Sequence, residues 1–358
     1  MTREIEWIEI ARTGCMLLVV LSHVLDIFLF HGGEAAQPWE LAFLCFSRFA
    51  VPMFFIISGF LLRIEFDRSP EPVRYGEFLR HKVATVLAPF FIWNAIYLVF
   101  ARVLMGWPLF SGSAMFAFLT GFVHLYFVFV LFQFFLLYPL LHRHLQGRGL
   151  NWALAVSVVL SLGFYGVSEY ALWVSGISEP TFEWHYGKLF FGWSAFFMTG
   201  VWLGARPDRV ELLAGHTLSL FVLGSVLLVP YYYETSRQLE VFHVYGRGYF
   251  LLSGFPFHLV GALFMVGLLR SVERSFRKGR ILNYLIRSGV DTFEIYIVHY
   301  LFLLLLVAAW TGLGLPGALL VKIPVLFLCV WLLSHGFAGL RRRPSLAGAG
   351  KLFFGHRD

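Results

Sequence analysis

Apolar runs of about 20 residues recur along the whole chain, and short polar connections separate them. A run of this length crosses a hydrocarbon core of roughly 30 Å as an α-helix. The pattern therefore predicts an all-α fold, a polytopic transmembrane helical bundle with about ten spans. We place them at residues 8–30, 41–63, 84–105, 120–141, 151–170, 188–204, 217–233, 249–270, 289–311 and 316–339.

Basic residues concentrate in every second connection. If the N-terminus is cytoplasmic, the inner segments hold 21 Lys and Arg residues, whereas the outer connections hold Arg102, Lys188, Arg237 and Arg247. Cytoplasmic segments of membrane proteins carry such an excess. We expect both termini to be cytoplasmic, in a multi-pass protein of the plasma membrane, which in bacteria is the inner membrane.

Composition supports a lipid environment, because 59% of the residues are hydrophobic and 14% charged, against roughly 25% charged in soluble proteins. The net charge of +7 could suggest nucleic acid, but the basic residues lie between spans, so we expect no nucleic-acid partner. Cys15, Cys45 and Cys329 all lie inside apolar runs. Their placement gives no disulfide framework and no metal-ligand spacing, so no metal is expected.

Ionisable groups inside a span cost roughly 2.5–3.5 kcal/mol each and therefore invite a functional explanation. The first span carries Arg12, His23 and Asp26. Arg12 could extend to the headgroups, but His23 lies 11 residues further on, roughly 16 Å along the helix. Span two runs back from the outside, so Arg48 should lie at the depth of His23.

An imidazole at that depth can accept a proton near neutral pH, as a general base must. Asp26 lies three residues after His23 on the same helix face and could orient the ring or keep it protonated. His23 could instead be a structural tie that hydrogen-bonds between helices.

The spacing from Arg12 to His23 is followed by Val-Pro-Met-Phe-Phe-Ile-Ile-Ser-Gly-Phe-Leu-Leu at residues 51–62. Together these resemble the membrane acyltransferase-3 family, which shows an Arg eleven residues before a His and then Pro-x-Phe-Phe-x-x-Ser-Gly-Phe-Leu. Three later segments are also similar to family elements. They are His124-Leu-Tyr-Phe with Tyr138-Pro139, Phe-Phe-Met-Thr-Gly at 196–200, and Thr-Phe-Glu-Ile-Tyr-Ile-Val-His at 292–299.

Two positions depart from the family pattern. Tyr126 stands where the family usually has Trp. Before Pro89 the family often has Arg-x-x-Arg, and here the corresponding residues are Lys82 and Thr85. Contact with donor phosphates would then depend on Arg80, Lys82 and the basic connection at residues 270–287.

The resemblance implies an integral membrane O-acyltransferase, usually an O-acetyltransferase. Such an enzyme moves an acyl group from cytoplasmic acyl-coenzyme A to a hydroxyl of a cell-surface glycan, lipid-linked sugar or similar acceptor. It implies a transmembrane domain at residues 1–340 and a short basic cytoplasmic tail at 341–358. The basic inner face would attract an anionic thioester. Direct transfer and an acyl relay across the membrane remain open alternatives, and the oligomeric state is not predicted.

The resemblance also suggests roles for individual residues. We expect His23, with Arg12, Arg48 and Asp26, to be catalytic. We expect Arg80, Lys82, Ser58 and Gly59 to contact the donor. We expect the acceptor to meet His124, Tyr126, Tyr296, His299 and Glu294.

Structural alternatives apply to several of these residues. Ser58 and Gly59 could serve close helix packing, as small residues in spans usually do. Glu294, Tyr296 and His299 could form an interhelical polar cluster, and His258 is interpreted as a satisfied core histidine. A transporter or flippase would also place polar residues at mid-depth, although a receptor or structural protein would leave Arg12, His23 and Arg48 unexplained.

Overall fold

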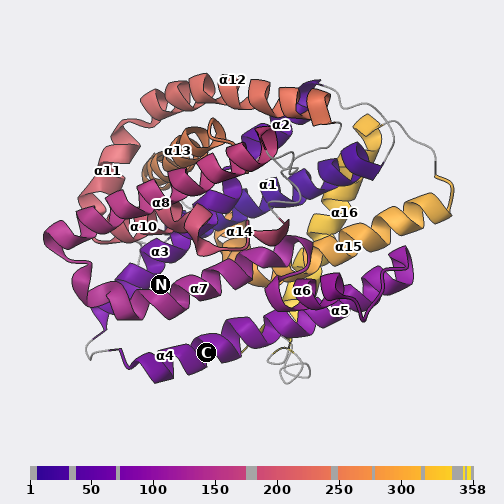
Figure 1. The fold of residues 1–358 in the computed structure, drawn as a ribbon, viewed down its shortest axis with the longest axis horizontal. Coiled ribbons are helices and arrows are strands. Elements are labelled where there is room, and N and C mark those ends of the chain that lie inside the picture. Colours follow the sequence, from indigo (N-terminus) through magenta and orange to yellow (C-terminus); the bar gives the residue numbers. More distant parts are fainter. Residues whose placement is uncertain are drawn as a thin grey trace. The chain divides into compact units, whose positions relative to one another are not determined.

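The structure, a computed structural model, describes residues 6–31, 38–69, 73–174, 184–242, 249–275, 279–315, 319–340, 350 and 353–355. Most of these residues are helical, and the described ranges contain no strand. The chain divides into two compact units, whose helices are labelled in Figure 1. Unit 1 comprises residues 1–72 and 141–289, and unit 2 comprises residues 73–140 and 290–358.

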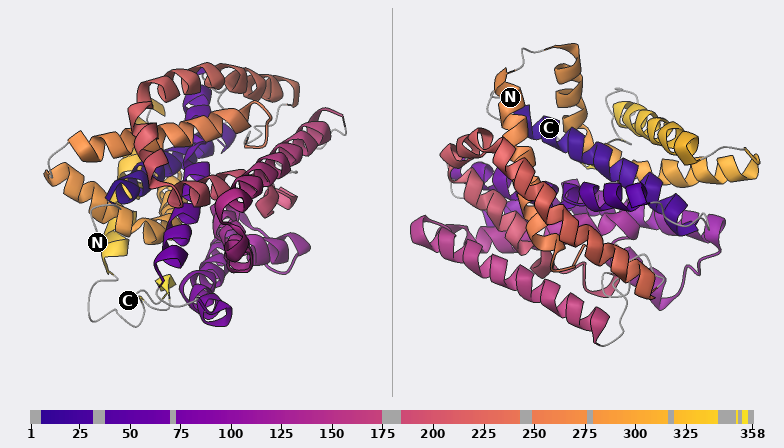
Figure 2. Two further views of the ribbon diagram at one scale, coloured as in Figure 1. Left: turned by 90° about the vertical axis from the view of Figure 1, so that its left-hand side faces the viewer. Right: turned by 90° about the horizontal axis from the view of Figure 1, so that it is seen from above.

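Unit 1 contains the N-terminal helices and the middle of the chain. Its helices are α1 (Glu6–His31), α2 (Pro38–Ser47), α3 (Ala50–Arg68), α8 (Gly147–Trp173), α10 (Ser194–Gly204), α11 (Pro207–Gly215), α12 (Thr217–Phe242), α13 (Gly254–Ser275) and α14 (Arg280–Val290). Unit 2 contains α4 (Tyr75–Lys82), α5 (Ala88–Met105), α6 (Gly112–Thr120), α7 (Tyr126–Leu141), α15 (Thr292–Gly312) and α16 (Leu319–Leu340). Within unit 2, α15 and α16 pack side by side (Figure 2).

Nine helices in the described part of the chain are long and apolar enough to span a membrane, which confirms the predicted polytopic helical fold. The sixth predicted span, residues 188–204, is shorter than the others. It consists of a 3₁₀ turn at Phe190–Trp193 followed by α10. The two segments together extend for roughly 22–25 Å, less than the hydrocarbon core.

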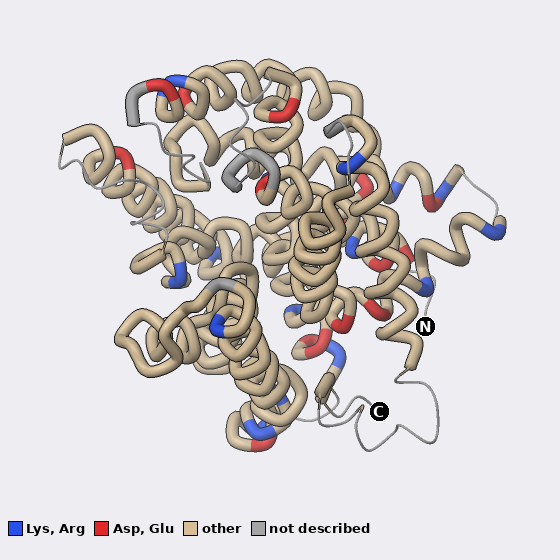
Figure 3. Tube along the Cα trace, turned by 90° about the vertical axis from the view of Figure 1, so that its right-hand side faces the viewer, with Lys and Arg blue, Asp and Glu red and all other residues tan. Residues whose placement is uncertain are grey.

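Charged residues gather at helix ends and turns, whereas the long helices are uncharged along most of their length (Figure 3). This distribution is what the cost of burying charge in lipid requires. The side of the membrane on which each terminus lies stays a prediction. The proposed tail at residues 341–358 lies mostly outside the described residues.

Proline interrupts the second span at a position that matters for the site. This span runs from Pro38 to Arg68, and the helix breaks at Arg48 and Phe49, between α2 and α3. Pro52 has no backbone N–H, and its ring clashes with the carbonyl four residues earlier, which is that of Arg48. The break therefore follows from the Pro-x-Phe-Phe motif.

Pro89 has a similar effect in the third span. The residues before it, Val83–Leu87, form a π-helical segment between α4 and α5. The carbonyl four residues before Pro89 belongs to Thr85, and Gly355 packs so closely there that a Cβ would lie 2.5 Å from this oxygen. Gly355 adopts φ +80°, a conformation that favours glycine.

Glycines bring α3 and α10 into direct backbone contact (Figure 1). A Cβ on Gly59 would lie 2.1 Å from the Phe197 carbonyl oxygen, and one on Gly200 would lie 1.9 Å from that of Ile56. No larger residue fits either position without moving a helix. The Ser-Gly and Phe-Phe-x-x-Gly motifs thus meet as a small-residue helix interface.

Candidate active site

His23 lies in the C-terminal half of α1, beside an acidic neighbour. Its Nδ1 is 3.7 Å from Asp26 Oδ2, within ion-pair range, and both side chains are partly buried. The preceding residue, Ser22, hydrogen-bonds Ser47 of α2 at 2.6 Å. Ser22 directly precedes His23, and Ser47 directly precedes Arg48. The serine contact therefore places His23 and Arg48 at the same level along the two segments, as residue counting predicted.

Arg48 is buried at the break between α2 and α3. Its Nη1 donates a hydrogen bond to the Tyr231 hydroxyl at 3.1 Å, and its guanidinium lies 5.5 Å from the centre of the Tyr249 ring. Tyr231 belongs to a buried apolar cluster that also contains Cys45, Phe49 and Phe257. The hydrogen bond to Tyr231 of α12 and the surrounding aromatic rings therefore fix the position of the Arg48 guanidinium.

His258 was wrongly interpreted as a satisfied core histidine. Its side chain on α13 is fully buried, but neither ring nitrogen has a hydrogen-bond partner among the described residues. The ring packs edge-on against Tyr231, with centroids 5.1 Å apart, and Tyr249 lies 6.1 Å away. A buried imidazole with unused nitrogens beside Arg48 is a functional candidate, and no sequence signal distinguishes it from a packing residue.

Arg12 occupies a different place from His23. Its Nη1 pairs with both carboxylate oxygens of the buried Glu9, at 2.9 and 3.2 Å. Thr13 lies one helical turn after Glu9, and its hydroxyl donates a hydrogen bond to the Leu285 carbonyl. Gly289 packs on the Glu9 backbone. The Arg12–Glu9 pair thus lies where α1 meets α14, 11 residues before His23.

Unit 2 contains a second cluster, built from three of the predicted acceptor residues. The rings of His124 and His299 have centroids 4.8 Å apart, and the Tyr296 hydroxyl donates to the His124 carbonyl. His299 Nδ1 donates to the Tyr296 carbonyl at 2.7 Å, since a carbonyl oxygen can only accept. This contact fixes the tautomer and makes Nε2 the basic nitrogen of His299.

A strained turn holds His124 in this cluster. Val123 has φ +40°, which is uncommon for a β-branched residue. Gly121 has φ +104°, and a Cβ there would lie 2.4 Å from the Tyr126 nitrogen. Asn94 of α5 accepts a hydrogen bond from the Phe122 backbone at 2.7 Å. Strain of this kind, held by neighbouring contacts, is typical of functional sites.

The remaining predicted contacts lie in several environments. The Ser58 hydroxyl bonds the Phe54 carbonyl within its own helix, and Gly59 faces Phe197. Tyr126 is the first residue of α7 and is buried, whereas Glu294 is fully buried in the first turn of α15. Their roles in donor or acceptor binding stay predictions.

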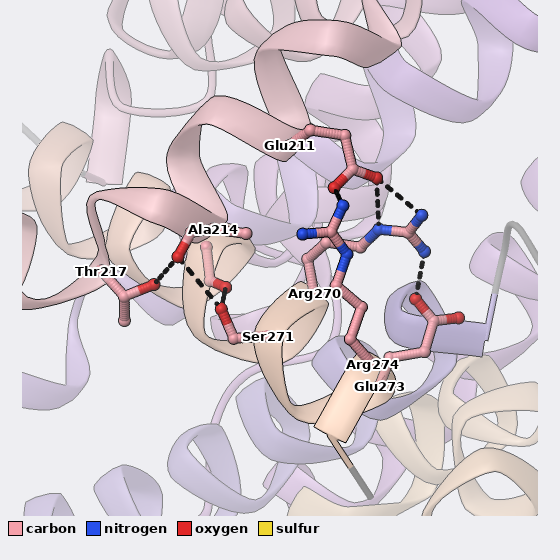
Figure 4. A network of polar contacts seen from close by, with 8 residues as sticks. Glu211, Ala214, Thr217, Arg270, Ser271, Glu273 and Arg274 are labelled. Carbon is pink, nitrogen blue, oxygen red and sulfur yellow. Dashed lines mark hydrogen bonds and ion pairs between the residues drawn. The ribbon is translucent and has the colours of Figure 1, made fainter.

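The basic residues predicted to meet the donor differ in exposure. Arg80 is exposed near the end of α4, and the Lys82 ammonium lies 5.0 and 5.2 Å from the Phe78 and Phe135 ring centres. In the connection at 270–287, Arg270 binds Glu211 at 2.7 and 2.8 Å (Figure 4). Arg274 also pairs with Glu211, so two of these cations are already neutralised.

In the described ranges, no group of three His, Cys, Asp or Glu residues is arranged to hold a metal ion. The chemistry that the described side chains offer is proton transfer by histidine and charge stabilisation by a buried arginine. The fold and these clusters together define the class of this protein. It is a polytopic helical membrane protein with His and Arg clusters buried at mid-span.

The comparisons with known proteins identify the family. A family model described as an acyltransferase domain matches residues 5–335, and the chain belongs to this family. A similar protein is YfiQ of Bacillus subtilis (strain 168), named "Putative membrane-bound acyltransferase", with 27% identity over 219 residues. The alignment covers 58% of this chain and 58% of the relative. No solved structure matches. The predicted membership of the membrane acyltransferase-3 family is thus confirmed.

Proposed function

We propose that this protein transfers an acyl group, most simply acetyl, from acyl-coenzyme A to a hydroxyl of a glycan, lipid-linked sugar or similar acceptor. The observation that carries the proposal is the polar cluster of unit 1, in which the partly buried His23 imidazole, with its Asp26 carboxylate neighbour, lies at the same level as the buried Arg48 guanidinium. Membership of the acyltransferase family supports the reaction type.

In the proposed reaction His23 is the general base. Asp26 faces Nδ1, so Nε2 takes the proton of the acceptor hydroxyl while its oxygen bonds to the acyl carbonyl carbon. The carbon–sulfur bond then breaks and coenzyme A leaves as a thiolate, which takes up the proton. Arg48 stabilises the negative charge that develops on the carbonyl oxygen.

His258 supports Arg48 in this scheme. It lies against the same two tyrosines, and both of its nitrogens are available for a hydrogen bond to substrate or to a rearranged guanidinium. His299 is a second candidate base, because the Tyr296 carbonyl orients its ring. Parallel variants of His23 and His299 assign the role.

Arg80 and Lys82 are the proposed contacts for the donor phosphates. Both lie where α4 enters the π-helical segment, at an end that the charge pattern predicts to be cytoplasmic. Arg270 and Arg274 are less suited to this role because Glu211 and Glu273 pair with them.

The test uses the purified full chain in lipid nanodiscs with acetyl-labelled coenzyme A and a panel of glycans and lipid-linked sugars. Transfer of label to an acceptor, matched by an equal amount of released coenzyme A thiol, would support the proposal. A transporter or flippase needs no coenzyme A. Absence of both donor binding and thiol release would therefore contradict an acyltransferase that uses this donor.

A further inference from the structure

The segment at residues 353–355 packs against the third span within unit 2. Phe354 is 4% exposed, and the centre of its ring lies 6.2 Å from that of Trp93 on α5 and 5.7 Å from that of Phe337 on α16. The Trp93 indole donates a hydrogen bond to the Phe353 carbonyl at 2.8 Å. Aromatic packing and this hydrogen bond therefore fix the segment on α5 and α16.

Gly355 brings the same segment onto the π-helical residues Val83–Leu87. A Cβ on Gly355 would lie 2.5 Å from the Thr85 carbonyl oxygen and 2.7 Å from the Thr85 Cα. Thr85 is 5% exposed, whereas its neighbours Val83 and Ala84 are exposed. The segment therefore covers one face of the π-helical turn, at a distance that only glycine permits.

This π-helical turn sets the direction of the two cations that are proposed to meet the donor. The Ala88 N–H bonds the Val83 carbonyl five residues back, so the turn holds one residue more than an α-helical turn. Each residue of an α-helix advances about 100° around the axis, so relaxation of the turn to α-helix would rotate α4 by roughly that angle relative to α5. Arg80 and Lys82 lie in the last turn of α4 and would rotate with it.

The helix needs support from outside at this turn. Pro89 has no N–H, so the Thr85 carbonyl four residues earlier lacks its α-helical donor. Gly355 packs at that same residue, and Lys82 lies three residues before it. π-helical turns are rare and frequently occur at functional sites. The 353–355 segment thus contacts the helix where its own hydrogen bonding is interrupted, next to the proposed donor contacts.

We infer that the segment at residues 353–355 positions Arg80 and Lys82 for the phosphates of the acyl-coenzyme A donor. The segment holds the π-helical turn in place, and the turn fixes the rotation of α4. Its residues act through the two cations, so they are positioning residues. This inference rests on the proposed function and adds a part of the chain that is distant in sequence to the proposed donor site.

Gly355→Ala is the informative variant, because its Cβ does not fit against Thr85. In the full chain in nanodiscs it should raise the KM for acetyl-coenzyme A about fivefold or more, while kcat and the acceptor KM change less than about twofold. Phe354→Ala removes one ring of the aromatic contact and keeps the glycine, and it should shift the donor KM in the same direction. An unchanged donor KM in both variants would overturn the inference.

Gly314→Ala is the matched control, because Gly314 belongs to the same unit and has φ +60°, but a Cβ there meets no atom within 4 Å. It carries the strain of alanine at positive φ without the contact. Backbone amide exchange at residues 83–88, measured by mass spectrometry, should accelerate in Gly355→Ala and stay unchanged in Gly314→Ala. Unchanged exchange in Gly355→Ala, or equal donor KM values in the two glycine variants, would contradict the positioning role.

A double-mutant cycle tests whether the segment acts through the two cations. When Arg80→Ala and Lys82→Ala are already present, Gly355→Ala should raise the donor KM by less than about twofold further. Full additivity would overturn the inference. A wild-type chain that neither bound coenzyme A nor transferred label would instead contradict the proposed function. If the wild-type chain did both and Gly355→Ala kept its donor KM, only the present inference would fail.

Discussion

Arg48 owes its position to a proline four residues further along the chain. Pro52 cannot donate to the Arg48 carbonyl, and the helix breaks there. The break turns a lipid-spanning position into a buried turn, where the guanidinium reaches Tyr231. The motif whose glycine serves helix packing thus also positions a buried charge.

At the residue scale, Tyr231→Phe tests the Arg48 contact. The variant leaves a buried guanidinium donor without its hydroxyl acceptor, so the free energy of unfolding should fall by about 1–3 kcal/mol. Tyr233→Phe is the matched control, because Tyr233 lies on the same helix and is 68% exposed. Thermal unfolding in nanodiscs measures both, and equal midpoints would contradict the assigned contact.

The sequence predicted some residue contacts and could not predict others. The match in level between His23 and Arg48 follows from counting residues along antiparallel helices. Arg12 and Glu9 are three residues apart, so their pairing could have been predicted from helix periodicity. Tyr231 lies 183 residues from Arg48, and the unsatisfied state of His258 depends on tertiary packing, so neither was predictable.

At the scale of elements, length and hydropathy were enough to locate the nine membrane-length apolar helices of the described ranges, because lipid requires long apolar helices. The broken second span and the π-helical segment in the third were not predicted. Both follow from Pro52 and Pro89, whose effects on the preceding carbonyls are local and could have been used. The close contact of α3 with α10 could not be predicted, because it depends on tertiary packing. Its glycines, Gly59 and Gly200, were nevertheless visible in the sequence.

Gly200→Ala tests the contact between α3 and α10. The added Cβ would lie 1.9 Å from the Ile56 carbonyl oxygen, so the helices must separate and the unfolding temperature should fall strongly. Gly163→Ala in α8 meets no atom within 4 Å and should be neutral or stabilising by up to about 1 kcal/mol. Similar effects of the two variants on thermal unfolding would contradict this interface.

The end of α4 is tested by the double variant Arg80→Ala, Lys82→Ala. Loss of two cations should raise the KM for acyl-coenzyme A about tenfold or more, and the KM for the acceptor should change little. Arg74→Ala is the control, because Arg74 is an exposed cation on the same unit that pairs with Glu77. An unchanged donor KM in the double variant would place the donor elsewhere.

At the scale of the whole molecule, the distribution of basic residues predicts the orientation in the membrane. Residues 63–82 and 270–287 should both be cytoplasmic. We expect Glu77→Cys and Asn283→Cys to react with a membrane-impermeant thiol reagent only after cells are opened. Ser113→Cys, exposed in an outer connection, should react in intact cells. Labelling of Glu77→Cys or Asn283→Cys from outside would refute the orientation.

The most direct test of the account is acyl transfer by His23→Gln, measured with labelled acyl-coenzyme A in the same preparation as the wild-type protein. Glutamine keeps hydrogen-bonding capacity but cannot act as a base, so turnover should fall about 10²- to 10⁴-fold while donor binding and thermal stability are retained. Near-normal transfer by a stable His23→Gln protein would contradict the catalytic assignment and identify His23 as an interhelical tie.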